Sequence, residues 1–256
     1  MLGLHQNFDS IDYGGMTLQE RVNVQVLWDK LSDMEDRLSF AGKAYPDGMC
    51  AFPFRLRGQG FFPGGDGLWR GEGAVSEPTS GALPQDGVMF LGNDFGTLQS
   101  FQQLRDRGFE SPPTWRHLKA RVRRANIPPD QVFCSNVIVG LRNGLGDSAL
   151  TKRKWRMREG FPQFCAEFLR FQLTTVRPQL VVTLGPEAAD GMAELNGTTS
   201  SRIAGEMTIG DLDTYVLSMS HPYGDFNFDD ARLKRDADVL SQAWSDAMRI
   251  RSSRER

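Results

Sequence analysis

Residues 87–97, which read GVMFLGNDFGT, contain the pattern on which the architecture of this chain depends. Four apolar residues at 88–91 are followed by Gly92 and by the polar pair Asn93 and Asp94. A short apolar run that ends in turn residues is typical of a strand buried on both faces, as in a parallel sheet. We therefore predict a buried strand at 88–91, with Asn93 and Asp94 just beyond its carboxyl end.

Strand and helix patterns alternate from this segment to the end of the chain. Further strands are expected at 132–139, 179–184 and 215–219. Helices are expected from Thr114 to about Ala125, over 161–176, from Pro186 onward, and from Asp229 or Asp230 to about Met248. Strands that alternate with helices indicate a mostly parallel sheet with helices on both faces. The predicted fold class is α/β, a three-layer α/β/α sandwich with a mostly parallel central sheet.

Residues 1–85 have a different character. Thr17 and Glu20 have the spacing of a capping box, and apolar residues at near-helical spacing follow, so a helix is expected over about 17–40. Residues 41–85 are rich in Gly, Pro and Phe and show little periodicity, which is typical of irregular structure. We therefore predict that residues 1–85 form a helix and an irregular extension packed on the main domain, and that residues 86–256 form the α/β domain.

The composition excludes several classes of protein. The 256 residues suffice for one sizeable domain, and no run of eighteen apolar residues occurs. The first residues, MLGLHQNFDS, lack the basic start and apolar run of a signal peptide, so we expect a cytoplasmic protein with no membrane segment. We also expect a monomer. Cys50, Cys134 and Cys165 form no paired spacing, which excludes a disulfide framework and a four-thiolate metal site. We expect neither a metal nor a cofactor.

Positive charge is concentrated locally although the net charge is −2. The run TKRKWRMR at 151–158 holds five cations, and residues 116–124 hold five more. Such patches can neutralise phosphates even on a protein without excess positive charge. A solvated loop or helix face is the alternative interpretation.

Polar residues follow three of the expected strands. In an open α/β sheet, ligands bind beyond the carboxyl ends of the strands. The clusters GND at 92–94, SN at 135–136 and SHP at 220–222 all lie at such ends. Asp and Asn are common turn residues, so one cluster alone would indicate little. Together, the three clusters bring Asp94, Asn136 and His221 toward one crevice.

At these clusters the chain resembles the uracil-DNA glycosylase superfamily, over about residues 87–247. The first segment, GVMFLGNDFGT, is similar to the first motif of the family, and three more segments match later motifs in the same order. They are FCSNVIVGLRNG at 133–144, RPQLVVTLGPEAA at 177–189 and SMSHPYGDFNF at 218–228. The resemblance implies a uracil-DNA glycosylase-like fold and a monofunctional enzyme that flips a pyrimidine out of DNA, hydrolyses its N-glycosidic bond and leaves an abasic site.

The chain departs from the family pattern at several positions. The branches with an iron–sulfur cluster need four Cys ligands, but here only Cys165 stands at such a position, and Gly140 replaces another. The last motif has Tyr223 where the family usually has Ser. Gly96 occupies the position of a Tyr in the strict uracil enzymes.

The resemblance also implies roles for individual residues. Asp94 would orient or deprotonate water and stabilise the cationic sugar, and His221 would donate a hydrogen bond to O2 of the base. Asn136 would read the Watson–Crick edge, and its amide can pair with either a uracil-type or a cytosine-type edge. Asn93 would contribute backbone N–H groups. The alternatives are a turn or capping Asp, a structural His before Pro222, and a strand-end Asn that bonds to backbone.

Aromatic and basic residues are expected to contact the DNA. Phe95, Phe109 and Trp115 are candidates to stack on the flipped base, with core packing as the alternative. Tyr223 and Phe226 could wedge into the vacated stack, or pack within their loop. Phosphate contacts are expected from the basic run, in particular from Lys152, Arg153, Lys154 and Arg156.

Gly96 bears on the choice of substrate. A glycine removes the wall that a Tyr would place against C5 of the base. The pocket could then admit hydroxymethyluracil or a hypermodified phage base such as glucosylated hydroxymethylcytosine, which would make the enzyme a phage-defence protein. If Gly96 only serves a turn, plain uracil in base-excision repair is the alternative. A non-catalytic reader of modified DNA and a protein that bonds covalently to abasic DNA also remain open.

Overall fold

A five-stranded sheet forms the centre of the protein. The computed structural model describes residues 25–37, 45–53, 83–107, 113–143, 160–198, 204–222 and 229–254. The strands lie in the order β3-β2-β5-β7-β6, and all neighbours are parallel except β6 and β7. Their bounds are β2 Val88–Gly92, β3 Val132–Asn136, β5 Leu180–Leu184, β6 Ala204–Ile209 and β7 Leu212–Met219.

The side chains of the central strands alternate between two apolar layers. In β2, Met89 and Leu91 belong to one buried cluster, whereas Val88 and Phe90 belong to the other. Every residue of β2, β3 and β5 is buried. Successive strand residues point to opposite faces, so a strand that is covered on both sides has an uninterrupted apolar sequence.

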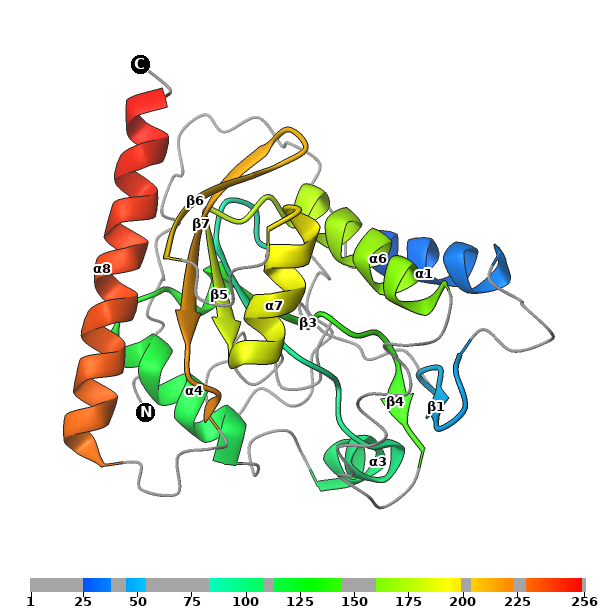
Figure 1. The fold of residues 1–256 in the computed structure, drawn as a ribbon. Helices are drawn as coiled ribbons and strands as arrows, with labels where there is room; N and C mark the ends of the chain where they lie inside the picture. The colour runs from blue at the N-terminus through cyan, green and yellow to red at the C-terminus, as the bar shows by residue number, and fades with distance from the viewer. Residues whose placement is uncertain are drawn as a thin grey trace, which may run out of the picture.

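Helices cover both faces of the sheet (Figure 1). Helices α1 (Gln25–Arg37), α6 (Phe161–Val176) and α7 (Pro186–Leu195) contribute to the first cluster, and α4 (Pro113–Arg124) and α8 (Asp230–Arg254) contribute to the second. The predicted three-layer α/β/α sandwich is confirmed. Among the helices that the structure describes, none has the length and apolar character needed to cross a membrane.

Parts of the N-terminal segment pack on this sandwich. Helix α1 lies within the range predicted for a helix and buries its apolar face against α6. Strand β1 (Met49–Cys50) pairs antiparallel with β4 (Leu141–Arg142), which follows β3 in the chain. The division of the chain at residue 85 stays a prediction.

The structure differs from the sequence prediction at several elements. The strand expected over 132–139 ends at Asn136, because its neighbour β2 ends at Gly92. Beyond it, the amides of Val137 and Ile138 donate to the carbonyls at the end of β2 and in the turn after β2. Helix α3 (Leu98–Arg107) and the antiparallel strand β6 were not predicted. Helix α8 continues past Met248 to Arg254.

Candidate active site

The strand order gives the sheet a switch point between β2 and β5. The chain passes from β2 to β3 on one side, and from β5 to β7 on the other. Ligands bind at such points because the loops that follow the two strands lead apart. Asp94 follows β2, Asn136 ends β3 and His221 follows β7, so all three lie at the carboxyl edge of the parallel strands.

Three donors hold the carboxylate of Asp94. Its Oδ1 accepts the backbone N–H of Gly96 at 2.9 Å, and its Oδ2 accepts the side-chain amide of Asn93 at 3.1 Å. The guanidinium Nη2 of Arg142 lies 3.4 Å from Oδ1, and the two side chains are 12% and 10% exposed. A mostly buried carboxylate needs such compensation to remain charged. The three contacts also fix the orientation of its oxygens.

The amide of Asn136 is buried beside this carboxylate turn. The side chain is 3% exposed, and Asn136 pairs with Gly92 in the register of β2 and β3. A Cβ built on Gly92 would lie 2.2 Å from Oδ1 of Asn136, so only glycine leaves room for the amide. Among the described residues, Nδ2 of Asn136 has no hydrogen-bond partner. An unsatisfied buried donor costs about 1–3 kcal/mol, and such a group is typical of a ligand site.

His221 lies beyond the end of β7, where its side chain is exposed. It stands next to the turn that follows β5, since a Cβ built on Gly185 would lie 3.5 Å from the Cβ of His221. Two side chains of α4 hold the backbone around it: Nδ1 of His117 lies 2.9 Å from the carbonyl oxygen of Pro222, and Arg121 donates to the carbonyl of Ser220 at 3.3 Å. The position of His221 therefore depends on α4 as well as on the sheet.

Gly96 has the backbone of a turn and open space beside it. Its φ is +84°, which favours glycine, and no described atom lies within 4 Å of a Cβ built there. Both interpretations of Gly96, a turn residue and an open side of a pocket, are compatible with this geometry. They must be separated by substitution.

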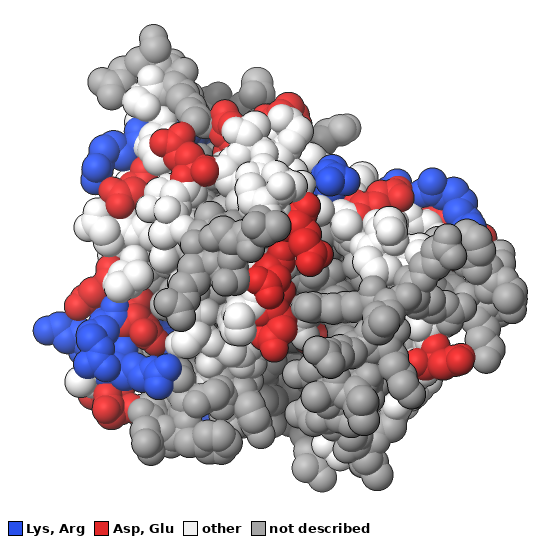
Figure 2. All heavy atoms as spheres, in the orientation of Figure 1, with Lys and Arg blue, Asp and Glu red and all other residues white. Residues whose placement is uncertain are grey.

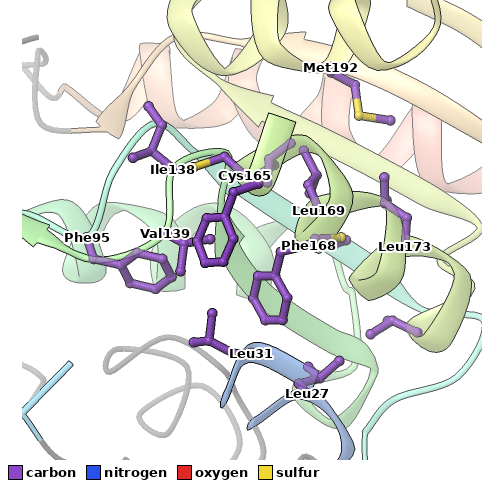
Figure 3. Close-up of a cluster of buried hydrophobic side chains, with 14 of the residues drawn as sticks. Leu27, Leu31, Phe95, Ile138, Val139, Cys165, Phe168, Leu169, Leu173 and Met192 are labelled. Atoms are coloured by element: carbon purple, nitrogen blue, oxygen red, sulfur yellow. The ribbon is translucent and has the colours of Figure 1, made fainter. Parts of the chain in front are cut away.

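The aromatic candidates lie in the core where the structure describes them. Phe95 is 5% exposed and meets Phe52 edge to face, with ring centroids 4.8 Å apart. Figure 3 shows Phe95 at the side of the buried cluster that contains Cys165 and Phe168. Trp115 is buried in the second cluster. Their packing is that of core residues, so a stacking role for either stays a prediction. Other candidates lie outside the described residues, namely Phe109, Tyr223, Phe226, Lys152, Arg153, Lys154 and Arg156.

The basic stretch at 116–124 is not one uniform surface. Arg121 is 1% exposed and forms an ion pair of 2.6 Å with Asp236, so it does not contribute to a phosphate-binding face. Arg124 is paired with Asp230 at 2.5 Å. Figure 2 shows Lys and Arg gathered where α4 and α8 lie side by side, and acidic side chains along α7. The region of α4 and α8 also carries acidic side chains, whereas the charged side chains of α7 are all acidic.

Cys134 and Cys165 are buried, Cys50 is half-buried, and all three are free thiols. Burial raises the pKa of the Cys165 thiol to about 12, and burial also raises the pKa of the Cys134 thiol well above its ordinary value. A Cβ built on Gly140 would collide with Tyr45 and with the backbone of Cys50. In the part of the chain that the structure describes, no group of three or more His, Cys, Asp or Glu residues could hold a metal ion.

Sequence reasoning missed Arg142 and the role of α4. Arg142 reaches Asp94 because β4 turns back beside residues 96 and 97, a contact that no sequence spacing indicates. His117 and Arg121 lie four residues apart and so share a helix face. That spacing was visible in the sequence, but the loop that they contact was not.

A parallel sheet that carries a held carboxylate, a buried amide and an imidazole at its switch edge belongs to the α/β enzymes that bind ligands beyond their strand ends. A family model, the uracil DNA glycosylase superfamily, matches residues 79–247. The chain belongs to this superfamily. Its membership supports the activity of a DNA glycosylase, a hydrolase that acts on DNA in DNA repair. No curated protein matches the chain.

Proposed function

We propose that this glycosylase flips a pyrimidine nucleotide out of DNA and hydrolyses its N-glycosidic bond without a metal, as a monofunctional monomer. The observation that carries the proposal is the buried, unpartnered Nδ2 of Asn136 beside the held carboxylate of Asp94. A base edge would satisfy the amide, and its sugar would then lie at the end of the neighbouring strand. The α/β domain, residues 86–256, would bind the nucleotide, with residues 1–85 packed against this domain.

In the proposed reaction, the bond between C1′ and the base nitrogen breaks as the sugar gains oxocarbenium character. The electron pair leaves with the base, and negative charge grows on O2. The carboxylate of Asp94 stabilises the cationic sugar and accepts a proton from the water that attacks C1′. His221 donates a hydrogen bond to O2 of the leaving base. The base anion takes up a proton from solvent, Asp94 returns its proton to solvent, and the products are an abasic site and the free base.

The substrate that we propose is a pyrimidine with a substituent at C5. The open space beside Gly96 supports a pocket without a wall at that atom. The substituent could be a hydroxymethyl group or the glucosylated hydroxymethyl group of a phage cytosine, and the second would give the enzyme a role in phage defence. If a residue other than Gly96 closes the pocket at C5, the favoured substrate is uracil.

The test is the incubation of the protein with oligonucleotides that carry uracil, thymine, hydroxymethyluracil, hydroxymethylcytosine or glucosylated hydroxymethylcytosine, followed by alkaline cleavage. We expect cleavage at a 5-substituted base. Asp94→Asn should slow base release by about two to four orders of magnitude, as for a positioned acid–base group, and leave DNA binding intact. Asp213→Asn, an exposed carboxylate on β7, is the matched control and should not change the rate.

The alternatives give different results in the same assay. Cleavage at uracil alone would identify an ordinary repair enzyme. Tight binding to modified DNA without any abasic product would identify a non-catalytic reader. A covalent adduct on a denaturing gel would identify a protein that bonds to abasic DNA.

A further inference from the structure

We propose that α4 clamps the backbone on both sides of His221, so that His117 and Arg121 are positioning residues for base release. This proposal rests on the proposed role of His221. The two contacts act on the carbonyl groups of Ser220 and Pro222, the residues directly before and after His221.

The clamp follows from the geometry of one helix. His117 and Arg121 are separated by four residues, so their side chains leave α4 on the same face. The imidazole reaches the carbonyl of Pro222 at 2.9 Å, and the guanidinium reaches the carbonyl of Ser220 at 3.3 Å. Because a carbonyl can only accept, Nδ1 of His117 must carry a hydrogen. In the neutral ring, the clamp therefore requires the tautomer that carries its hydrogen on Nδ1.

The buried charge of Arg121 has a second partner. Its Nη2 lies 2.6 Å from the carboxylate of Asp236 on α8, although the guanidinium is almost inaccessible to water. Arg232, also on α8, donates to the side-chain hydroxyl of Ser220 at 3.3 Å. Both helices thus contact the exposed residue Ser220, and α4 also contacts Pro222 on the other side of His221.

A buried ion pair is seldom needed for stability alone. Removing two charges from water offsets much of their attraction, and apolar residues of similar size often serve a core as well. Leu118 and Val122, which lie on either side of Arg121 in the sequence of α4, both belong to the second apolar cluster. The ion pair keeps the guanidinium of Arg121 beside residues 220–222. Its Nη2 faces Asp236, and its Nη1 donates to the carbonyl of Ser220, next to His221.

Such a clamp should affect the chemical step more than binding. A hydrogen-bond donor stabilises a developing charge only if its position is fixed before the reaction. A loop that moves by a fraction of an ångström would still bind DNA but would present the imidazole of His221 less accurately to O2. The expected signature is a lower kcat with an unchanged Kd for DNA.

The experiment measures kcat, the single-turnover rate of base release, DNA affinity and Tm for variants of His117. His117→Ala should lower kcat about tenfold, the effect of one lost hydrogen bond at its upper range. His117→Asn places an amide N–H near the position of Nδ1 and should restore kcat to within about twofold, whereas His117→Gln should not. Val122→Ala, which removes apolar packing from the same helix but no hydrogen bond to residues 220–222, should lower Tm and leave kcat unchanged.

Arg121→Lys provides a second test. It keeps a charge opposite Asp236 but has one donor head instead of a fork, so kcat should again fall while Kd stays constant. If His117→Ala and Arg121→Lys both retain the wild-type kcat, or if kcat follows Tm in all variants including Val122→Ala, the clamp is refuted.

A measurement without activity separates this inference from the proposed function. The chain has three histidines, so the imidazole nitrogens can be assigned by NMR with the His117 variants. Neutral His117 should carry its hydrogen on Nδ1, and the opposite tautomer would overturn the clamp. A wild-type protein that releases no pyrimidine would overturn the proposed function and the catalytic purpose of the clamp, even if the tautomer is as expected.

Discussion

The contact between Arg142 and Asp94 can be tested with little disturbance of the backbone. The backbone N–H of Arg142 donates to the carbonyl of Gly96 at 2.9 Å, and its strand pairs with β1 through main-chain bonds. Any side chain except proline at 142 keeps these bonds. Arg142→Met therefore removes the guanidinium but preserves the strand and much of the apolar stem.

The magnitude follows from the geometry. At 3.4 Å and an effective dielectric constant of about 20, the attraction between the two charges is about 5 kcal/mol before desolvation is subtracted. A hydrogen bond to a charged group retains about 1.5–3 kcal/mol in net terms. Asn93 and Gly96 still hold the carboxylate in the variant. We therefore expect base release to slow by about ten- to hundredfold, together with a lower Tm.

The assay is single-turnover base release by Arg142→Met, Arg142→Lys and the double variant Asp94→Asn/Arg142→Met. Arg177→Met is the matched control, because it breaks an exposed pair with Asp211 away from the site. If Arg142 acts through Asp94, its substitution should have almost no further effect once Asp94 is Asn. A wild-type rate in Arg142→Met, or additive losses in the double variant, would refute the reasoning.

Four further predictions concern the substrate, the DNA interface, metal dependence and pH. Gly96→Tyr should abolish release of the 5-substituted base and reduce uracil release less, whereas Gly96→Ala should cost both activities the same small factor; equal losses in both variants would make Gly96 a turn residue only. Neutralising Lys152, Arg153, Lys154 and Arg156 should flatten the salt dependence of the DNA affinity, and an unchanged slope would exclude phosphate contacts. A chelator should leave base release unchanged and the purified protein should show no iron–sulfur absorption; loss of activity would indicate a metal. Burial raises the pKa of Glu35, against a smaller opposing effect from its hydrogen bond with Tyr45, so the folded state binds its proton more tightly than the unfolded state. Stability from this group is present below pH 4.5 and is lost as the pH rises through the folded pKa. The Tm of Glu35→Gln should therefore rise relative to that of the wild type between acidic and neutral pH. A Tm difference that does not change with pH would show that Glu35 is not perturbed.

The layers of the fold could be predicted because local patterns determine them. The runs 88–91 and 180–184 are apolar apart from Thr183 and have no polar face, so each had to lie inside a covered sheet. Helix α6 begins at Phe161 and ends at Val176, as its pattern predicted. Strand β6 was not predicted because only Met207 and Ile209 of its residues are buried, and its order comes from pairing with β7.

The site could be predicted only in part for a related reason. Asp94, Asn136 and His221 each stand at or just beyond the end of a recognisable strand, so the parallel sheet brings them to one edge. Arg142, His117 and Arg121 act through contacts between segments that are distant in the chain. The sequence contains the donors but no pattern that indicates their acceptors, which are a side chain in one case and backbone carbonyls in the others.

The pairing of Gly92 with Asn136 has a consequence for how this enzyme can diverge. The amide and the turn that carries Asp94 are mounted on adjacent strands, whose spacing of roughly 4.8 Å is set by main-chain hydrogen bonds. Gly96 lies beyond those strands, in a turn with free space around it. With the role proposed for Gly96, a substitution there would change which bases are accepted, and the main-chain pairing of Gly92 with Asn136 would stay as it is.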